Sequence, residues 1–106
     1  MNFYPFHIGD YISHTHHLSD LEDLAYRRLL DWYYLHESPI PLNIDETARL
    51  IRMRTHTDCI TIVLREFFQE TEDGWISIRA DREIDHYHSK IKQASNAGKA
   101  SAERRL

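Results

Sequence analysis

Histidine is the residue type in this sequence whose number and spacing most directly suggest chemistry. The stretch YISHTHHL at residues 11–18 holds three histidines, and His7 lies just upstream. Structural zinc sites use four ligands at defined spacings, commonly including cysteine, but Cys59 is the only cysteine in the chain. His86 and His88 could complete such a set only if a C-terminal helix folded back beside this stretch. We therefore predict no metal and no cofactor, and we interpret these histidines as polar residues that precede a helix.

The residue patterns of the common enzyme classes do not occur in this sequence. It contains no glycine-rich phosphate-binding loop and no GxSxG nucleophile motif. Cys59 lies in an apolar stretch, so its thiol is expected to face or flank the core rather than to form a dyad with a histidine. The carboxylates at 20–31 and 81–85 are spaced as solvated helix faces, and they do not form a set that converges on a metal. We predict that the protein is not an enzyme.

Length and composition indicate a single globular domain. The chain has 106 residues, of which 42% are hydrophobic and 28% are charged, and this is enough for one compact core. No apolar run approaches the roughly 20 residues of a membrane span, and no signal peptide is recognisable at the N-terminus. A single cysteine excludes an internal disulfide and suits a reducing compartment. We expect a cytoplasmic protein with no membrane partner.

The net charge of −4 is unevenly distributed along the chain. Residues 57–75 contain five acidic side chains against one arginine, a local net charge of −4. Residues 89–106 contain five basic side chains against one glutamate, a local net charge of +4. An acidic middle and a basic end are separate surfaces, and each could choose a different partner.

The strongest helical pattern covers residues 20–36. Ser19 is suited to cap this helix, and Glu22 three residues later completes a capping box. Acidic residues fill the first turn, where the helix dipole favours them, and the prolines that follow Ser38 end the helix. Further aromatic residues widen the apolar surface, which predicts burial on more than one side. The expected buried stripe consists of Leu21, Leu24, Ala25, Leu29, Trp32 and Leu35.

Two shorter helices are predicted after the prolines. Asn43 or Asp45 can cap the first, and Thr57 or Asp58 can cap the second. The second has apolar residues at the spacing that an amphipathic helix requires. These apolar residues are Ile60, Val63, Leu64, Phe67 and Phe68.

A small hairpin and a last helix complete the pattern. Asp73-Gly74 is a tight-turn signal, WISIR at 75–79 alternates as a strand, and QETE at 69–72 can supply its partner. A further helix is predicted from near Ala80. Residues 3–12 mix aromatic and β-branched residues, which predicts a short extended segment with a turn. The apolar face of the last helix is expected to consist of Ile84, Tyr87, Ile91 and Ala94.

This order of elements predicts a fold class that is mainly α with a small β wing. A helix, a short helix, a turn, a helix and then a hairpin with glycine at its tip is the order of a winged helix-turn-helix. Here it is preceded by the short extended N-terminal segment. The IPL stretch at 40–42 would provide the third short strand of such a fold. We predict a winged-helix domain over residues 1–95 and a basic, flexible tail over 96–106.

Several short motifs run through nearly the whole chain. In the first part they are Tyr4-Pro5-Phe6, Ile8-Gly9-Asp10-Tyr11, Ala25-Tyr26-Arg27-Arg28-Leu29-Leu30-Asp31 and Pro39-Ile40-Pro41-Leu42. In the second part they are Glu66-Phe67-Phe68, Asp73-Gly74-Trp75, Arg79 with Asp81, Glu83 and Ile84, and AGKASAERR at 97–105. Together these motifs resemble the YdaU family of prophage proteins, which is known as a domain of unknown function.

The resemblance implies a biological setting rather than a catalytic site. Family members lie among phage replication genes, often beside genes for helicase-loader-like proteins, so the resemblance implies an initiator-like or loader-like DNA-binding role. No catalytic residues are associated with the family, and none is carried over. Members often continue well past the end of this chain, which implies that the tail at 96–106 leads to a C-terminal region missing from this chain.

The DNA-binding hypothesis depends on the predicted helix at 57–69, because the second helix of a helix-turn-helix enters the major groove. We expect Thr61 and Gln69 to lie near the bases. Acidic residues in the predicted wing oppose this role, because phosphate contacts require positive charge. The expected phosphate contacts are Arg49, Arg52, Arg54 and Arg65. Sequence-independent attraction is expected from Lys90, Lys92, Lys99, Arg104 and Arg105.

The alternative function is a protein-interaction or oligomerisation module that uses the same scaffold without direct DNA contact. The chain has two tryptophans, six tyrosines and four phenylalanines, more than one small core easily hides, and aromatic residues are enriched at interfaces. A competing explanation is that these rings pack the first helix against the N-terminal segment. The expected partners are DNA, a replication or other phage or host protein, or a second copy of the chain. The candidate interface residues are Tyr4, Phe6, Tyr11, Tyr33 and Tyr34.

Overall fold

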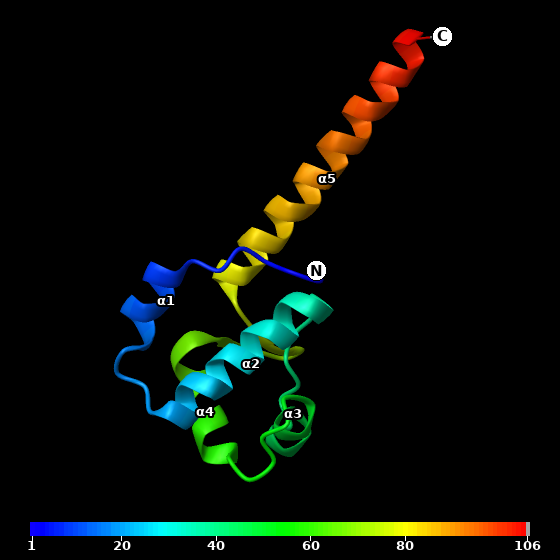
Figure 1. Cartoon of the computed structure of the whole chain (residues 1–106). Coiled ribbons are helices and arrows are strands. Elements are labelled where there is room, and N and C mark those ends of the chain that lie inside the picture. The colour runs from blue at the N-terminus through cyan, green and yellow to red at the C-terminus, as the bar shows by residue number, and fades with distance from the viewer. Residues whose placement is uncertain (106) are drawn as a thin grey trace.

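The chain folds into a small helical body from which one long helix projects (Figure 1). The structure is a computed structural model that describes the backbone of residues 1–105 and the side chains of residues 1–97. Its largest dimension is 60 Å, against 30 and 21 Å in the other directions. The described elements are α1 (Ile8–Thr15), α2 (Asp20–His36), α3 (Ile44–Leu50), α4 (Thr57–Phe67), β1 (Gln69–Thr71), β2 (Gly74–Ile76) and α5 (Ile78–Arg105). A mainly helical fold with a small sheet is thereby confirmed.

Helix α2 is the central element of the body, and it begins as predicted. The Ser19 side chain accepts a hydrogen bond from the Glu22 backbone, and the Glu22 side chain accepts one from the Ser19 backbone, so the capping box is complete. The buried face of α2 is formed by Ala25, Leu29 and Tyr33, which recur every four residues.

The predicted buried stripe of α2 is therefore only partly right. Leu21, Leu24 and Leu35 are exposed, because the face that packs against α4 is rotated toward Tyr33. Tyr34 is buried as well, beneath the N-terminal segment. Burial on more than one side of this helix is thus confirmed.

Helices α3 and α4 pack beneath α2. The predicted N-terminal cap of α3 is confirmed and that of α4 is not. Asn43 caps α3 by accepting a hydrogen bond of 3.0 Å from the Glu46 backbone. Helix α4 begins after His56, whose side chain makes no capping hydrogen bond. The predicted caps Thr57 and Asp58 lie inside the helix, so that prediction was wrong. Four of the five predicted apolar residues, Ile60, Val63, Leu64 and Phe68, are buried, and Phe67 is partly buried against the core.

The hairpin forms at the predicted turn but is shorter than predicted. Strands β1 and β2 are antiparallel, with Glu70 opposite Trp75. The predicted third strand is reduced to one bridge, in which Ile40 and Trp75 exchange backbone hydrogen bonds of 2.9 and 2.8 Å. The predicted strand at 75–79 stops at Ile76, because the Ser77 hydroxyl accepts a hydrogen bond from the Ala80 backbone and α5 begins at Ile78.

The N-terminal segment differs most from the prediction. Residues 1–7 are irregular, but residues that were expected to turn at Gly9-Asp10 form helix α1. The Ser13 and Thr15 hydroxyls donate to the carbonyls of Gly9 and Tyr11, at 2.8 and 2.6 Å. These bonds reach back four residues, so the helical geometry of α1 satisfies both hydroxyls within the helix.

Among the described side chains of α5, the buried ones lie at its beginning. Ala80 and Ile84 are buried, whereas Ile91 is 49% exposed. The predicted apolar face of this helix is therefore only partly covered. The backbone remains helical to Arg105, beyond the predicted fraying point near residue 95, and the domain boundary at 95 stays a prediction. Among the described helices, none combines the length and apolar character needed to cross a membrane.

Gly74 is the position where the hairpin depends on glycine. Its φ is +136°, and an added Cβ would lie 2.3 Å from the Ile40 carbonyl oxygen. We expect Gly74→Ala to lower the free energy of unfolding by about 1–3 kcal/mol or more, measured by urea denaturation. Gly9→Ala is the matched control, because an added Cβ there meets nothing within 4 Å and alanine favours a helix by about 0.5–1 kcal/mol. Equal denaturation midpoints for the two variants would contradict this role of Gly74.

Candidate nucleic-acid interface

Three of the predicted DNA-binding residues lie together at the turn between α3 and α4. Arg49, Arg52 and Arg54, here called the turn arginines, line one surface hollow of about 450 Å³. All three are exposed. Within the described part of the chain none of them forms an ion pair, although Asp45 lines a neighbouring hollow with two of them. The turn therefore presents positive charge to solvent.

Arg28 of α2 holds the backbone of this turn in place. Its Nη1 donates hydrogen bonds of 3.2 and 3.0 Å to the carbonyls of Ile51 and Arg52. Arg52 has a positive φ of 62°, an uncommon backbone conformation for a residue other than glycine. Met53 is buried, and its N–H donates to the Ala48 carbonyl at 2.8 Å. The guanidinium groups of the turn arginines thus project from a fixed backbone.

The outer face of α4 continues from this turn. His56 lines the hollow and immediately precedes α4. Thr61 and Arg65 follow at four-residue spacing from Thr57, so they share one face of the helix. The Thr61 hydroxyl donates to the Thr57 carbonyl at 2.8 Å, and Arg65 is exposed. These two predicted residues therefore lie on the helix that follows the turn, on the face that begins at Thr57, while the hollow of the turn arginines itself ends at His56.

Of the other predicted DNA-binding residues, those with described side chains lie elsewhere. Gln69 lies in β1 and lines a different cavity, between α1 and the beginning of α5. Lys90 lines a groove between α5 and the N-terminal segment, and Lys92 is exposed on α5. The side chains of Lys99, Arg104 and Arg105 lie outside the described residues.

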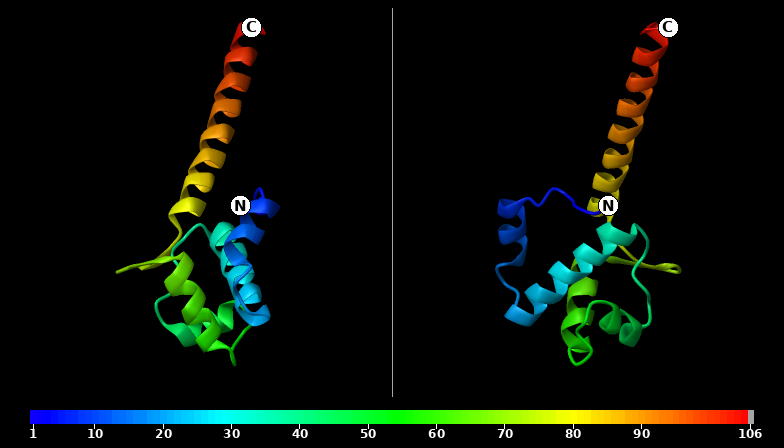
Figure 2. Two further views of the ribbon diagram at one scale, coloured as in Figure 1. Left: turned by 90° about the vertical axis from the view of Figure 1, so that its left-hand side faces the viewer. Right: turned by 45° about the vertical axis from the view of Figure 1, so that its right-hand side comes forward.

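The acidic residues of the hairpin form a separate surface. Glu70, Glu72 and Asp73 are exposed, and none of them forms an ion pair in the part of the chain described. The hairpin points away from the turn between α3 and α4 (Figure 2, left). Glu66 of α4 is instead paired with His17, whose Nε2 lies 2.5 Å from its carboxylate. The hairpin therefore carries a concentration of negative charge of its own, although Asp45 and Asp58 also place carboxylates near the turn arginines and on α4.

The predicted interface residues are largely used inside the chain. Tyr33 and Tyr34 are 2% and 5% exposed. Tyr4 stacks on Tyr34 with ring centroids 3.9 Å apart, and Tyr11 donates to the Asp23 carboxylate at 2.5 Å. The Arg27 guanidinium lies over the ring of Phe6, with its central carbon 4.0 Å from the ring centroid. Packing of α2 against the N-terminal part of the chain accounts for Tyr4, Phe6, Tyr11 and Tyr34, whereas Tyr33 packs near Phe68 and donates to Asp81 of α5. A role of these rings in binding a partner stays an untested prediction.

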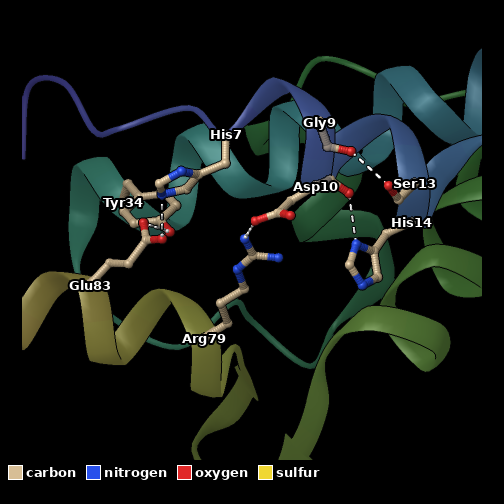
Figure 3. A network of polar contacts seen from close by, with 8 residues as sticks. All are labelled: His7, Gly9, Asp10, Ser13, His14, Tyr34, Arg79 and Glu83. Atoms are coloured by element: carbon tan, nitrogen blue, oxygen red, sulfur yellow. Dashed lines mark hydrogen bonds and ion pairs between the residues drawn. The ribbon is translucent and has the colours of Figure 1, made fainter.

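A network of charged groups joins α1 to α5 (Figure 3). The Arg79 guanidinium pairs with the Asp10 carboxylate at 2.8 Å. The Glu83 carboxylate accepts a hydrogen bond of 2.7 Å from the Tyr34 hydroxyl and faces His7 at 3.4 Å. A cavity of about 400 Å³ lies between these elements. No residue pattern in the sequence indicates this network or the role of Arg28, although Arg28 and Arg79 stand in the motifs that carry the family resemblance.

The histidines of the 11–18 stretch have ordinary structural partners. His14 contacts the Asp10 carbonyl at 2.7 Å, and His16 contacts the Ser13 carbonyl at 3.0 Å. They lie at the end of α1 and in the link to α2. Among the described residues, no three side chains of histidine, cysteine, aspartate or glutamate come together as ligands for a metal ion.

This arrangement defines a small, mainly helical domain with a two-stranded antiparallel sheet and an exposed basic turn. The sequence profile of the family described as protein of unknown function DUF1376 matches residues 2–85. The uncharacterized protein YdaU of Escherichia coli (strain K12) is 34% identical over 100 residues, which are 93% of this chain and 34% of that relative. The chain belongs to this family, which confirms the resemblance seen in its motifs. It spans about a third of the length of the curated relative that it matches. No solved structure matches the chain.

The buried tyrosines make stability sensitive to alkaline pH. Burial and the hydrogen bond to Asp81 raise the pKa of Tyr33 to about 12, whereas an unfolded tyrosine has a pKa of about 10. The unfolded state therefore loses this proton first, and the contribution to stability is lost as the pH rises from about 10 through 12. We expect Tyr33 alone to lower the free energy of unfolding by roughly 1–3 kcal/mol over this interval, measured by urea denaturation at each pH.

Tyr33→Phe is the matched variant for this test, because it removes the hydroxyl and keeps the ring. Its stability at neutral pH falls by about 1 kcal/mol, the usual effect of losing a buried hydrogen bond. Between pH 10 and 12 the free energy of unfolding of the variant falls by less than that of the parent protein, because one ionising group is gone. Parallel curves for the two proteins would show that Tyr33 does not contribute to the alkaline transition.

Proposed function

We propose that this domain is a non-enzymatic DNA-binding module with the arrangement of a winged helix-turn-helix. In this arrangement α3 and α4 are the helix-turn-helix pair, and β1 and β2 are the wing. The order of α2, α3, α4 and the hairpin supports it, as does the bridge between Ile40 and Trp75, which takes the place of the third strand.

The observation that carries this proposal is the cluster of turn arginines. Phosphate contacts supply most of the affinity for DNA and need cations that are free to make them. The turn arginines are exposed, form no ion pair in the described part of the chain, and project from a backbone that Arg28 holds. In this proposal they contact the phosphates together with Arg65 of α4, while Thr61 of the same helix lies near the bases of the DNA major groove.

The biological setting that fits this activity is phage or prophage DNA replication. The family resemblance points to initiation or helicase loading, and a replication protein of phage or host is then the expected protein partner. The chain corresponds to about a third of its relative. In this proposal the domain supplies contact with DNA, and the remainder of a longer protein supplies contact with the replication machinery.

Charge variants at the turn test this proposal. We expect Arg52→Gln and Arg65→Gln each to weaken duplex binding several-fold, and the double reversal Arg52→Glu/Arg65→Glu to abolish it. Each lost phosphate contact also reduces the slope of log affinity against log salt by about 1. The measurement is fluorescence anisotropy of a labelled duplex across a salt series, with circular dichroism to check folding.

The matched control is Ser95→Glu, which changes the net charge by the same amount as Arg52→Gln. Ser95 lies on the exposed part of α5, away from the α3–α4 turn, so its variant is expected to bind duplex like the parent protein. If all three single variants bind equally well, the turn is not the contact surface.

The acidic hairpin favours a second candidate function, docking of a basic protein partner. Glu70, Glu72 and Asp73 are exposed and lack ion pairs in the part of the chain described. These carboxylates are negative and repel phosphate, whereas the cations of a basic partner would pair with them. The same surface could also meet the basic turn of a second copy of this chain.

The variant Glu70→Gln/Glu72→Gln separates the two functions. If the hairpin lies beside bound DNA, loss of its negative charge strengthens duplex binding several-fold, because repulsion from phosphate is relieved. If the hairpin is a docking surface, the same change leaves duplex binding unaltered and weakens self-association, measured by sedimentation velocity at low salt. The first outcome is the one expected from the DNA-binding proposal.

A further inference from the structure

The N-terminal segment at residues 1–7, here called the arm, presents two different sides to the body. Tyr4 stacks on Tyr34 of α2, and Phe6 lies beneath the guanidinium of Arg27, also on α2. The alternate residues Phe3, Pro5 and His7 line a groove against α5. This is the two-residue alternation of an extended chain, so the order of residues in the arm decides which rings face the groove.

The arm is a fixed wall of this groove rather than a loose end. The Tyr4 hydroxyl donates to the Asp31 carboxylate at 2.6 Å. His7 faces the Glu83 carboxylate at 3.4 Å, and Glu83 also accepts the Tyr34 hydroxyl at 2.7 Å. In Figure 1 the arm crosses beside the first turns of α5, far from the turn between α3 and α4. The groove is therefore preformed and lies on a separate part of the molecule.

The groove combines an apolar floor with a basic edge. Its volume is about 430 Å³. The rings of Phe3 and Tyr87 face it, together with Met1 and Pro5, and Phe3 is 75% exposed. Two aromatic rings that line one groove, one of them largely exposed, offer flat apolar surface that a ligand can cover.

The basic edge is a straight stripe along α5. Arg82, His86 and Lys90 all line the groove, and they are four residues apart, so they lie on one face of the helix with a rise of about 6 Å between neighbours. In the described part of the chain none of the three forms an ion pair. The acidic residue in the lining is Glu83, whose carboxylate is already engaged by Tyr34 and His7.

We infer that this groove binds single-stranded nucleic acid. An unpaired base stacks on Phe3 and Tyr87, and successive phosphates follow the stripe of Arg82, His86 and Lys90. Aromatic platforms beside a line of cations are the general means of binding single strands. A duplex does not fit this groove, because its bases are stacked inside the helix and cannot reach the aromatic rings. The inference goes beyond the proposed function, since the ligand and the surface both differ.

Single-strand binding is tested by anisotropy of a labelled oligothymidylate at low salt, with the whole chain. We expect Phe3→Leu to weaken binding at least fivefold, because the side chain stays apolar and loses its flat face, and Phe3→Trp to bind as tightly as the parent protein or more so. Phe3 is exposed, so neither change threatens the fold. Equal affinities for Phe3→Leu and the parent protein would overturn base stacking at this site.

The basic stripe is tested with a matched pair of single-charge variants. Lys90→Gln and Ser95→Glu each lower the net charge by one. Ser95 faces away from the stripe, because five residues carry an α-helix about 140° beyond a full turn. We expect Lys90→Gln to weaken oligothymidylate binding several-fold and Ser95→Glu to leave it unchanged. Equal weakening by both variants would mean general charge attraction and would overturn the inference.

Two further results separate this site from the proposed duplex surface. The variant Arg52→Glu/Arg65→Glu is expected to keep its oligothymidylate affinity, and Lys90→Gln to keep its duplex affinity. Loss of single-strand binding in the turn variant would place that binding at the turn and overturn the groove. Competition by polyglutamate as effective as that by unlabelled oligothymidylate would assign the groove to an acidic peptide instead. Duplex binding can fail in these experiments while single-strand binding succeeds, so the two proposals stand or fall separately.

Discussion

The arrangement of this domain depends on two buried tyrosine hydroxyls that need hydrogen-bond partners. Tyr33 and Tyr34 are adjacent in α2, and burial of their rings is favourable only if the hydroxyls are satisfied. The first turns of α5 supply both acceptors, Asp81 at 2.5 Å and Glu83 at 2.7 Å. These two bonds fix the start of α5 against α2. Because Tyr34 also carries the stacked ring of Tyr4, they position the arm as well.

The same central helix also positions the basic turn. Ala25, Leu29 and Tyr33 bury one face of α2, which packs against α4, while Arg28 reaches the carbonyls of the turn between α3 and α4. One helix therefore determines where the turn arginines project and where the groove beside α5 opens. A change that rotated α2 would alter both surfaces at once.

Within the described residues, the cations of the α3–α4 turn and of the α5 stripe are not neutralised by ion pairs. The hairpin carboxylates have no ion-pair partners in the described part of the chain either. In contrast, Glu66, Glu83 and Glu37 are each faced by a histidine. The hydrogen bond from His88 and the amino group of Met1 lower the pKa of Glu37. Carboxylates near the arm and α1 are thus paired, and the exposed cations remain available to a ligand.

Local interactions account for what the sequence by itself determined. The capping box of Ser19 and Glu22, the cap at Asn43 and the turn at Asp73-Gly74 each involve residues within about four positions, so propensity and spacing were sufficient to predict α2, α3 and the hairpin. The grouping of Arg49, Arg52 and Arg54 was also predictable, since one short turn carries them all. Three features were not predictable from the sequence: helix α1, the side of α2 that is buried, and the groove between the arm and α5. They depend on contacts such as that between Tyr34 and Glu83, which are 49 residues apart, and only the packed tertiary structure brings such residues together, because no local signal encodes which distant acceptor a buried hydroxyl will meet.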